Sequence, residues 1–187
     1  WGIITSSTTK GESYAKGNIS LKSGSYETTS TNDTDWGILA SQTTTGVTYQ
    51  KGNASLMAST YETPNAIDST WGIITASTTK GESYAKGNAS LKSGSYETTS
   101  ENDSDWGILA SQTTTGVTYQ KGNASLTAST YETTNSVDST WGIITSSTTR
   151  GESYARGNAS LKSGSYETTS TNDTDWGILA SQTTTGV

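Results

Sequence analysis

The few apolar residues of this chain stand at regular intervals among polar ones. From Ala15 to Leu21, small and aliphatic residues alternate with polar residues, which is the period-two pattern of a β-strand. No segment shows the apolar stripe of an amphipathic helix. Thr, Tyr, Trp and Ile favour strands, whereas Ser, Gly and Asn favour turns. The first 35 residues therefore predict strands at 2–9, 13–22 and 25–30, with turns at Lys10-Gly11, Ser23-Gly24 and 31–35.

The same pattern returns every 35 residues. The units are 1–35, 36–70, 71–105, 106–140 and 141–175, followed by a partial unit, 176–187. Fixed-period self-similarity of this length is typical of repeat architectures. The aromatic residues form three columns: Trp1, Trp36, Trp71, Trp106, Trp141 and Trp176; Tyr14, Tyr49, Tyr84, Tyr119 and Tyr154; and Tyr26, Tyr61, Tyr96, Tyr131 and Tyr166.

Two kinds of unit alternate along the chain. Those that start at Trp1, Trp71 and Trp141 (A units) read WGIITxSTT(K/R)GESYA, and those that start at Trp36 and Trp106 (B units) read WGILASQTTTGVTYQ. The complete period is therefore 70 residues, and most of the charge lies in the A units. The partial last unit indicates that the chain is part of a longer array.

We predict an all-β, open-ended β-solenoid of stacked β-rungs, because no single unit carries enough apolar surface to form a core alone. Two stackings fit the period: a three-stranded rung of 35 residues, which we favour, or a coil of 14 residues. In the first, identical residues lie roughly 4.8 Å apart in successive rungs. Ile4 and Leu21 would then form a thin continuous core, with the Trp and Tyr columns inside or between the layers.

Composition excludes several function classes. Ser and Thr supply 69 of the 187 residues, large aliphatic residues only 24, and Phe, Cys and His are absent. Without His or Cys the usual catalytic bases, metal ligands and thiol nucleophiles are missing, and a repeated sequence offers no unique pocket, so we expect no enzyme. A net charge of −6 disfavours nucleic-acid binding. No apolar run is long enough to span a membrane, and no signal peptide is visible at Trp1, so we expect a mature chain or an excised segment.

Three motifs suggest modification or ion binding. Asn18, Asn53, Asn88, Asn123 and Asn158 begin Asn-x-Ser sequons, the acceptor pattern for N-glycosylation; Asn32, Asn102 and Asn172 also match. The Asn-Asp-x-Asp turn at 32–35 has oxygen ligands suited to Ca²⁺, although an Asx-turn with solvated carboxylates explains it more simply. We expect no other cofactor.

Two binding functions remain as alternatives. The aromatic columns suit stacking against sugars, although aromatic residues are also the largest apolar surface available for packing. A Thr column at 9, 44, 79, 114, 149 and 184 suggests ice binding. Its neighbouring columns are mixed, however, and Thr is also simply a good strand former.

A resemblance adds to this interpretation. The stretch KGNISLKSGSYETTS at 16–30, with its copies, resembles the repeats of filamentous haemagglutinin-type exoproteins and the β-roll heads of trimeric autotransporter adhesins. The resemblance implies secretion, a solenoid, and adhesion or scaffolding. We therefore expect an extracellular or cell-surface structural protein that self-associates into a fibre, filament or adhesin stalk, with a carbohydrate- or ice-binding module as the alternative and surface glycans as further partners.

Overall fold

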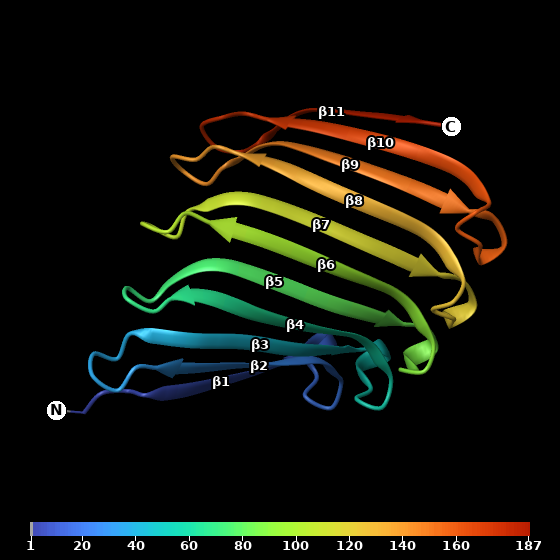
Figure 1. The fold of residues 1–187 in the computed structure, drawn as a ribbon. Helices are drawn as coiled ribbons and strands as arrows, with labels where there is room; N and C mark the ends of the chain where they lie inside the picture. The colour runs from blue at the N-terminus through green and yellow to red at the C-terminus, as the bar shows by residue number, and fades with distance from the viewer. Residues whose placement is uncertain (1) are drawn as a thin grey trace.

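The chain forms one continuous antiparallel β-sheet in which every strand pairs with its neighbours in sequence (Figure 1). The computed structural model describes residues 2–187, so Trp1 lies outside the described residues. The strands are β1 (Ser6–Tyr14), β2 (Lys22–Asn32), β3 (Leu39–Tyr49), β4 (Met57–Asp68), β5 (Ile73–Tyr84), β6 (Lys92–Asn102), β7 (Leu109–Tyr119), β8 (Thr127–Val137), β9 (Ile144–Tyr154), β10 (Lys162–Asn172) and β11 (Leu179–Gly186).

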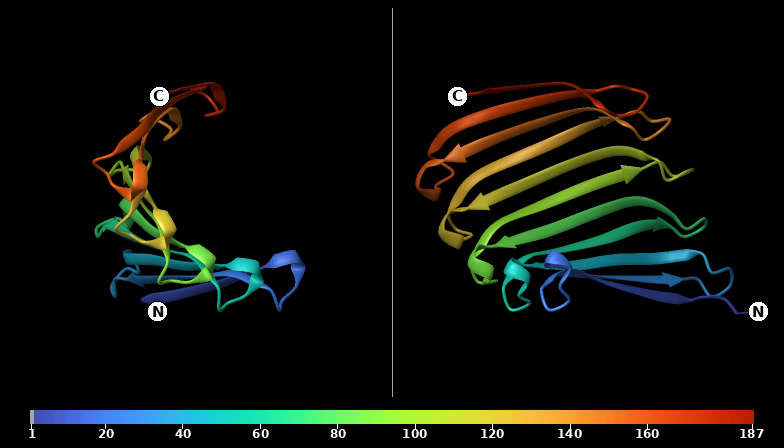
Figure 2. Two further views of the ribbon diagram at one scale, coloured as in Figure 1. Left: turned by 90° about the vertical axis from the view of Figure 1, so that its right-hand side faces the viewer. Right: turned by 180° about the vertical axis from the view of Figure 1, so that it is seen from behind.

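The all-β, repetitive and open-ended architecture that the sequence predicts is confirmed. The sheet is twisted and curved, and it does not close into a barrel (Figure 2). Each 35-residue unit supplies two strands rather than a three-stranded rung. Equivalent residues of successive units therefore lie two strands apart, at roughly 9.6 Å instead of 4.8 Å.

The strand boundaries within a unit differ from those predicted. Lys10-Gly11 lies inside β1 and Ser23-Gly24 inside β2, whereas most of the predicted strand 13–22 is a turn. The sequence predicts that Gly11 and Gly24 lie in turns, but both lie in strands. A Gly inside a strand often marks a place where another group approaches the backbone closely. A Cβ atom on Gly11 would lie 2.1 Å from the Tyr26 ring on the neighbouring strand.

Short turns, each closed by a hydrogen bond between residues three apart, connect the strands at one edge of the sheet: η1 (Ala15–Gly17), η2 (Gln50–Gly52), η3 (Ala85–Gly87), η4 (Gln120–Gly122) and η5 (Ala155–Gly157). In η1, Lys16 (φ 53°) and Gly17 (φ 63°) are both left-handed. The Asn18 amide donates to the Ala15 carbonyl at 3.0 Å. Two successive left-handed residues are what a tight type I′ connection requires, and Gly supplies one of them without steric cost.

The sheet is a single layer without a hydrophobic core. Among residues 2–187 no apolar side chain is buried, and the residues that are buried are glycines. The expected core of Ile4 and Leu21 is absent, because both residues lie in loops at opposite edges of the sheet. Ile4 is 69% exposed, and Leu21 contacts Gly52 of the next turn along its edge.

Rows of like side chains cross the sheet instead of a core. One row places Thr on every strand: Thr9, Thr28, Thr44, Thr63, Thr79, Thr98, Thr114, Thr133, Thr149, Thr168 and Thr184. The hydroxyls of alternate pairs share hydrogen bonds of 2.8–2.9 Å, as between Thr28 and Thr44. Cross-strand pairs of this kind contribute about 0.2–1 kcal/mol each, and they recur at every step along the sheet.

The row beside it alternates Gly and Tyr. Gly81 pairs with Tyr61 on one side and Tyr96 on the other, and a Cβ atom on Gly81 would lie 2.2 Å from Cε1 of Tyr96. The missing side chain of Gly therefore makes room for the ring, and the ring covers backbone that Gly would leave exposed. The tyrosines of the 26 column thus pack across strands rather than between layers.

We expect Gly81→Ala to lower the free energy of unfolding by about 1–3 kcal/mol, the usual cost of overpacking. Gly2→Ala is the matched control, because nothing lies within 4 Å of a Cβ atom there. In a Tyr96→Ala background the substitution at Gly81 should become neutral or stabilising, since Ala suits a strand better than Gly. Denaturant unfolding of the parent, Gly81→Ala, Tyr96→Ala and the double variant measures the coupling between Gly81 and Tyr96. An equal loss with and without the Tyr96 ring would contradict the packing described.

Candidate functional site

The loops of the sheet lie on two sides, at the two ends of the strands, and we call these sides the tryptophan edge and the sequon edge. The sheet also has two faces, and each edge and face carries different side chains. The loops that follow β2, β4, β6, β8 and β10 carry Trp and form the tryptophan edge. The η turns and the residues after them form the sequon edge. The charged face carries the row through Lys10 and the row through Glu12, and the opposite face carries the Thr9 row and the Gly-Tyr row.

An aspartate organises each loop of the tryptophan edge. In the loop after β2, Oδ1 of Asp33 accepts hydrogen bonds from the amides of Asp35 (2.9 Å) and Trp36 (2.6 Å), and Oδ2 accepts from the amide of Ile38 (2.6 Å). Asp68 accepts in the same way from Thr70 and Trp71. Of the two carboxylates that suggested a Ca²⁺ site at 32–35, that of Asp33 therefore accepts hydrogen bonds from backbone amides. Within residues 2–187, no group of three or more acidic side chains gathers where a metal ion would be held.

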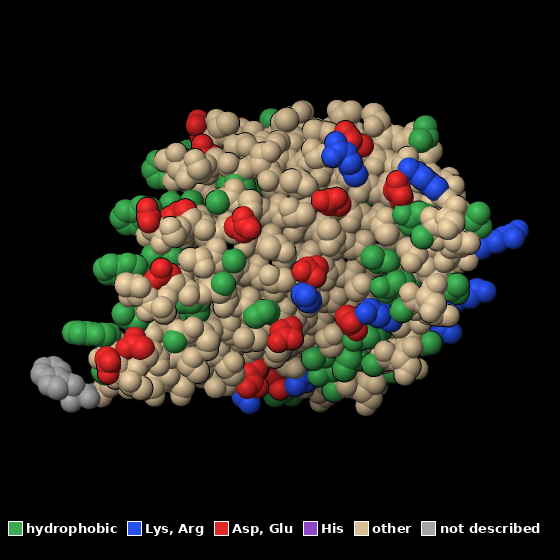
Figure 3. All heavy atoms as spheres, viewed as in Figure 1, with side chains coloured by type: hydrophobic (Ala, Val, Ile, Leu, Met, Phe, Trp, Pro, Cys, Tyr) green, Lys and Arg blue, Asp and Glu red, His purple; other side chains and the backbone are tan. Residues whose placement is uncertain are grey.

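The tryptophans themselves are largely exposed. Trp36, Trp71, Trp106, Trp141 and Trp176 have between 74% and 83% of their surface accessible. In Figure 3, green apolar side chains project along this side of the molecule. The structure thus places these residues at an edge, rather than inside or between layers as the sequence suggested.

Smaller apolar residues hold neighbouring loops of this edge together. Gly72 is left-handed (φ 71°), and a Cβ atom on it would lie 3.0 Å from Cγ2 of Ile38 in the preceding loop. The same contact joins Gly107 to Ile73 and Gly142 to Ile108. The Trp-bearing loops are therefore packed against each other in a regular column.

The five predicted sequons share one conformation at the sequon edge. In each, the Asn side-chain oxygen accepts a 2.9 Å hydrogen bond from the amide of the Ser two residues later, as Asn18 does from Ser20. All five asparagines are exposed. The second set differs, because Nδ2 of Asn32 donates to the Ile4 carbonyl at 3.0 Å, as do its copies at 102 and 172 to theirs. The structure therefore separates the two sets of sequons by accessibility.

The charged face is hollowed along its middle. A groove of about 1340 Å³ runs across it from β3 to β11 and is lined by the rows that continue from Lys10 and Glu12, with residues of the Gly-Tyr row between them. Ion pairs cross it between neighbouring strands, such as Lys80 with Glu97 at 3.3 Å and Arg150 with Glu167 at 2.7 Å. These pairs are exposed to solvent, so they add little stability individually.

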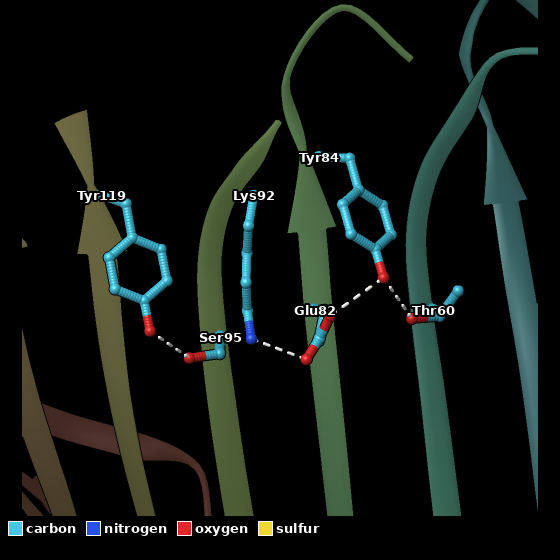
Figure 4. A network of polar contacts seen from close by, with 6 residues as sticks. All are labelled: Thr60, Glu82, Tyr84, Lys92, Ser95 and Tyr119. Atoms are coloured by element: carbon cyan, nitrogen blue, oxygen red, sulfur yellow. Dashed lines mark hydrogen bonds and ion pairs between the residues drawn. The ribbon is translucent and has the colours of Figure 1, made fainter. Parts of the chain in front are cut away.

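The Tyr14 column lies on the charged face and completes a polar network (Figure 4). Lys92 Nζ donates to Glu82 at 2.6 Å, and the Tyr84 hydroxyl donates to the other oxygen of that carboxylate at 3.0 Å. The Lys92 ammonium also lies 6.0 Å from the centre of the Tyr119 ring, within reach of a cation–π contact. Copies in β1–β2 and β9–β10 join the equivalent Glu, Tyr and Lys residues.

These contacts shift the pKa of several groups. The Lys92 ammonium holds the pKa of Glu82 below its usual value, and Lys162 does the same for Glu152. The hydrogen bond to Glu82 raises the pKa of Lys92. At the tryptophan edge, the backbone amide of Trp106 lowers the pKa of Asp103.

The Thr rows do not form a flat Thr surface. On one face, the Thr9 row is flanked by a Ser, Gln and Asn row and by the Gly-Tyr row. A second Thr row, through Thr8 and interrupted by Pro64, lies on the opposite face. Because the sheet is also twisted (Figure 2), neither face offers a planar array of matched Thr rows to an ice crystal. We therefore do not propose ice binding.

Sequence reasoning missed the interleaved half of the Thr row, such as Thr28 and Thr63, and the loop contacts of Leu21 and Ile38. A feature of the sequence that could have revealed the second strand is the Thr-Thr pair, which occurs twice in a unit, at 8–9 and 28–29. It marks two similar strands in each unit.

Comparison with protein-family models and with curated protein sequences finds no match to this chain. No helix among residues 2–187 has the length and apolarity to cross a membrane.

The lowered pKa values predict acid sensitivity. A carboxyl whose pKa is lowered by folding stabilises the native state fully above its unfolded pKa, and this contribution is lost as pH falls through the folded pKa. The melting temperature should therefore drop below about pH 4. Conversely, the raised pKa of Lys92 predicts a loss above about pH 10.

The double variant Glu82→Gln, Glu152→Gln should be less stable than the parent at neutral pH and should lose less stability between about pH 5 and pH 3. Thermal unfolding followed by circular dichroism across pH measures both. An unchanged acid limb in the variant would show that these carboxylates are not responsible.

Proposed function

We propose that this chain is a structural protein whose β-hairpins extend one continuous sheet, as part of an extracellular fibre, filament or adhesin stalk. The observation that carries the proposal is the cross-strand register, which repeats from β1 to β11 with the same rows of side chains. Nothing in this arrangement depends on a unique core or a unique pocket.

Stability in such a sheet comes from contacts between neighbouring hairpins. Each added hairpin contributes the same rows and the same loop contacts, as nearest-neighbour repeat proteins do. Length is therefore adjustable without redesign of the fold, which suits a stalk or fibre. We propose no catalytic role, because every constellation of side chains recurs along the array.

Self-association follows from the same geometry. In residues 2–187, the outer sides of β1 and β11 have no strand partner, and such edges pair readily with further strands. Another hairpin, from the same chain or from another copy, can continue the register.

Electron microscopy of the purified chain should show uniform filaments that lengthen with protein concentration. The triple variant Ser181→Lys, Thr183→Lys, Thr185→Lys in β11 should form shorter filaments or none, because charges on an edge strand oppose pairing with another strand. The matched control places lysines at the equivalent residues of β7, Ser111, Thr113 and Thr115, which adds the same charge away from an edge. Monodisperse particles of the unmodified chain, or an equal loss of filaments in both variants, would contradict assembly through the edge strand β11.

We also propose that the sequon edge carries glycans when the chain passes through a glycosylating secretory pathway. Two features support this: the exposure of the five asparagines, and side-chain hydrogen bonds in which their oxygen rather than their nitrogen takes part.

Expression in such a pathway, followed by peptide mass spectrometry, should find glycans at Asn18, Asn53, Asn88, Asn123 and Asn158. Asn32, Asn102 and Asn172 serve as internal controls in the same chain and should stay unmodified, because their side-chain nitrogens are hydrogen-bonded at strand ends. Equal occupancy of the two sets would contradict the proposed selectivity.

A further inference from the structure

We propose that the tryptophan edge binds an extended, uncharged polysaccharide of β-1,4-linked hexoses, with one disaccharide against each Trp. This inference does not rest on filament formation, since it concerns one edge of a single chain. It rests on the presentation, the spacing and the charge of the tryptophans.

The rings are held out from a rigid base. The Trp106 amide donates to Oδ1 of Asp103 at 2.7 Å, Gly107 follows in the left-handed conformation (φ 70°), and Ile73, the first residue of β5, packs against that glycine. The same arrangement fixes the other loops. A backbone fixed in this way loses little further freedom when a ligand binds. Large aromatic surfaces left 74–83% exposed at five equivalent places are an unusual feature of a surface without a partner.

The spacing selects the ligand. Successive Trp-bearing loops lie two strands apart, which is roughly 9.6 Å. In a β-1,4-linked hexose chain each residue is turned over relative to the one before, so the same CH-rich ring face returns once per disaccharide. The length of that disaccharide is close to the spacing of the loops. One straight polymer can therefore place the same face against each ring, where an apolar ring face is the natural partner of an aromatic side chain.

The polar groups beside the rings indicate that the ligand carries no negative charge. Asp35, Asp105 and Asp175 precede alternate tryptophans, and Thr70 and Thr140 precede the others. Carboxylates and hydroxyls accept hydrogen bonds from sugar hydroxyls, which complements aromatic stacking in carbohydrate sites. The same carboxylates repel uronic acids and sulfated sugars, so we infer a polymer without acidic groups.

The test uses cello-hexaose, which spans three disaccharides and hence three consecutive tryptophans. Binding is measured by isothermal titration calorimetry on the full chain and on two double variants, W36A/W71A and W71A/W106A. Each variant removes one Trp that follows Asp and one that follows Thr. The two variants differ only in which loops lose their Trp. W36A/W71A keeps Trp106, Trp141 and Trp176 in three successive loops, whereas W71A/W106A keeps at most two described tryptophans in successive loops.

We expect W36A/W71A to bind with about a threefold weaker apparent affinity, because among the five described tryptophans one window of three consecutive residues remains instead of three. W71A/W106A should bind at least about tenfold more weakly than W36A/W71A, the effect of one lost stacking contact. Ile19→Ala, which removes a residue 78% exposed at the opposite edge, should leave binding unchanged. Circular dichroism confirms that each variant remains folded.

Malto-hexaose has the same composition but α-1,4 links and a coiled shape, and it should bind much more weakly. Three results would overturn the proposal: no binding of cello-hexaose to the unmodified chain, equal binding of malto-hexaose, or equal affinities in the two double variants. The last would indicate a general apolar surface rather than a row matched to the ligand. None of these results bears on filament formation, which the lysine variants of β11 test separately.

Discussion

The antiparallel register between successive strands is the constraint on which the rest of this structure depends. It is set by backbone hydrogen bonds and by turns that recur in every unit at both edges, and it repeats along all 11 strands. Because the register is constant, each position in the repeat becomes a row across the sheet. Glycines open space for Tyr rings, threonines meet threonines, and lysines face glutamates. A slip of one residue would exchange the two faces and break every row at once.

A single layer of this kind explains the unusual composition. A sandwich or barrel needs one apolar face on each strand, whereas both faces of this sheet contact water, so Ser and Thr serve on both. The scarce aliphatic residues are used where loops meet, as between Leu21 and Gly52 or Ile38 and Gly72. Apolar contacts thus tie neighbouring loops together at both edges, and the strands between them are held by hydrogen bonds and cross-strand pairs. The largest apolar side chains of the described residues, the tryptophans, stay exposed at one edge, where we propose that they bind a polysaccharide.

The repeat and the all-β class could be predicted from the sequence, because periodicity and strand-forming residues are both visible in it. The number of strands in a unit could not, since Gly11 and Gly24 look like turn residues until the Tyr26 ring and the neighbouring backbone are seen beside them. The Lys-Gly turn at 16–17 looked like the middle of a strand because alternation continues through it. Of the candidate residues, the sequons could be located from the sequence, but only the structure separates Asn18 from Asn32. The exposure of the Trp column could not be predicted, because large aromatic residues are usually buried.

The hairpin register is tested most directly by a distance between equivalent loops several units apart. The chain has no cysteine, so Ile19→Cys and Ala159→Cys allow spin labels at two exposed positions of the sequon edge. These positions are four units and therefore eight strands apart, and pulsed electron paramagnetic resonance should give a distance of roughly 35–40 Å. A distance of roughly 19 Å, as expected when each unit advances the stack by one strand spacing, would contradict the account.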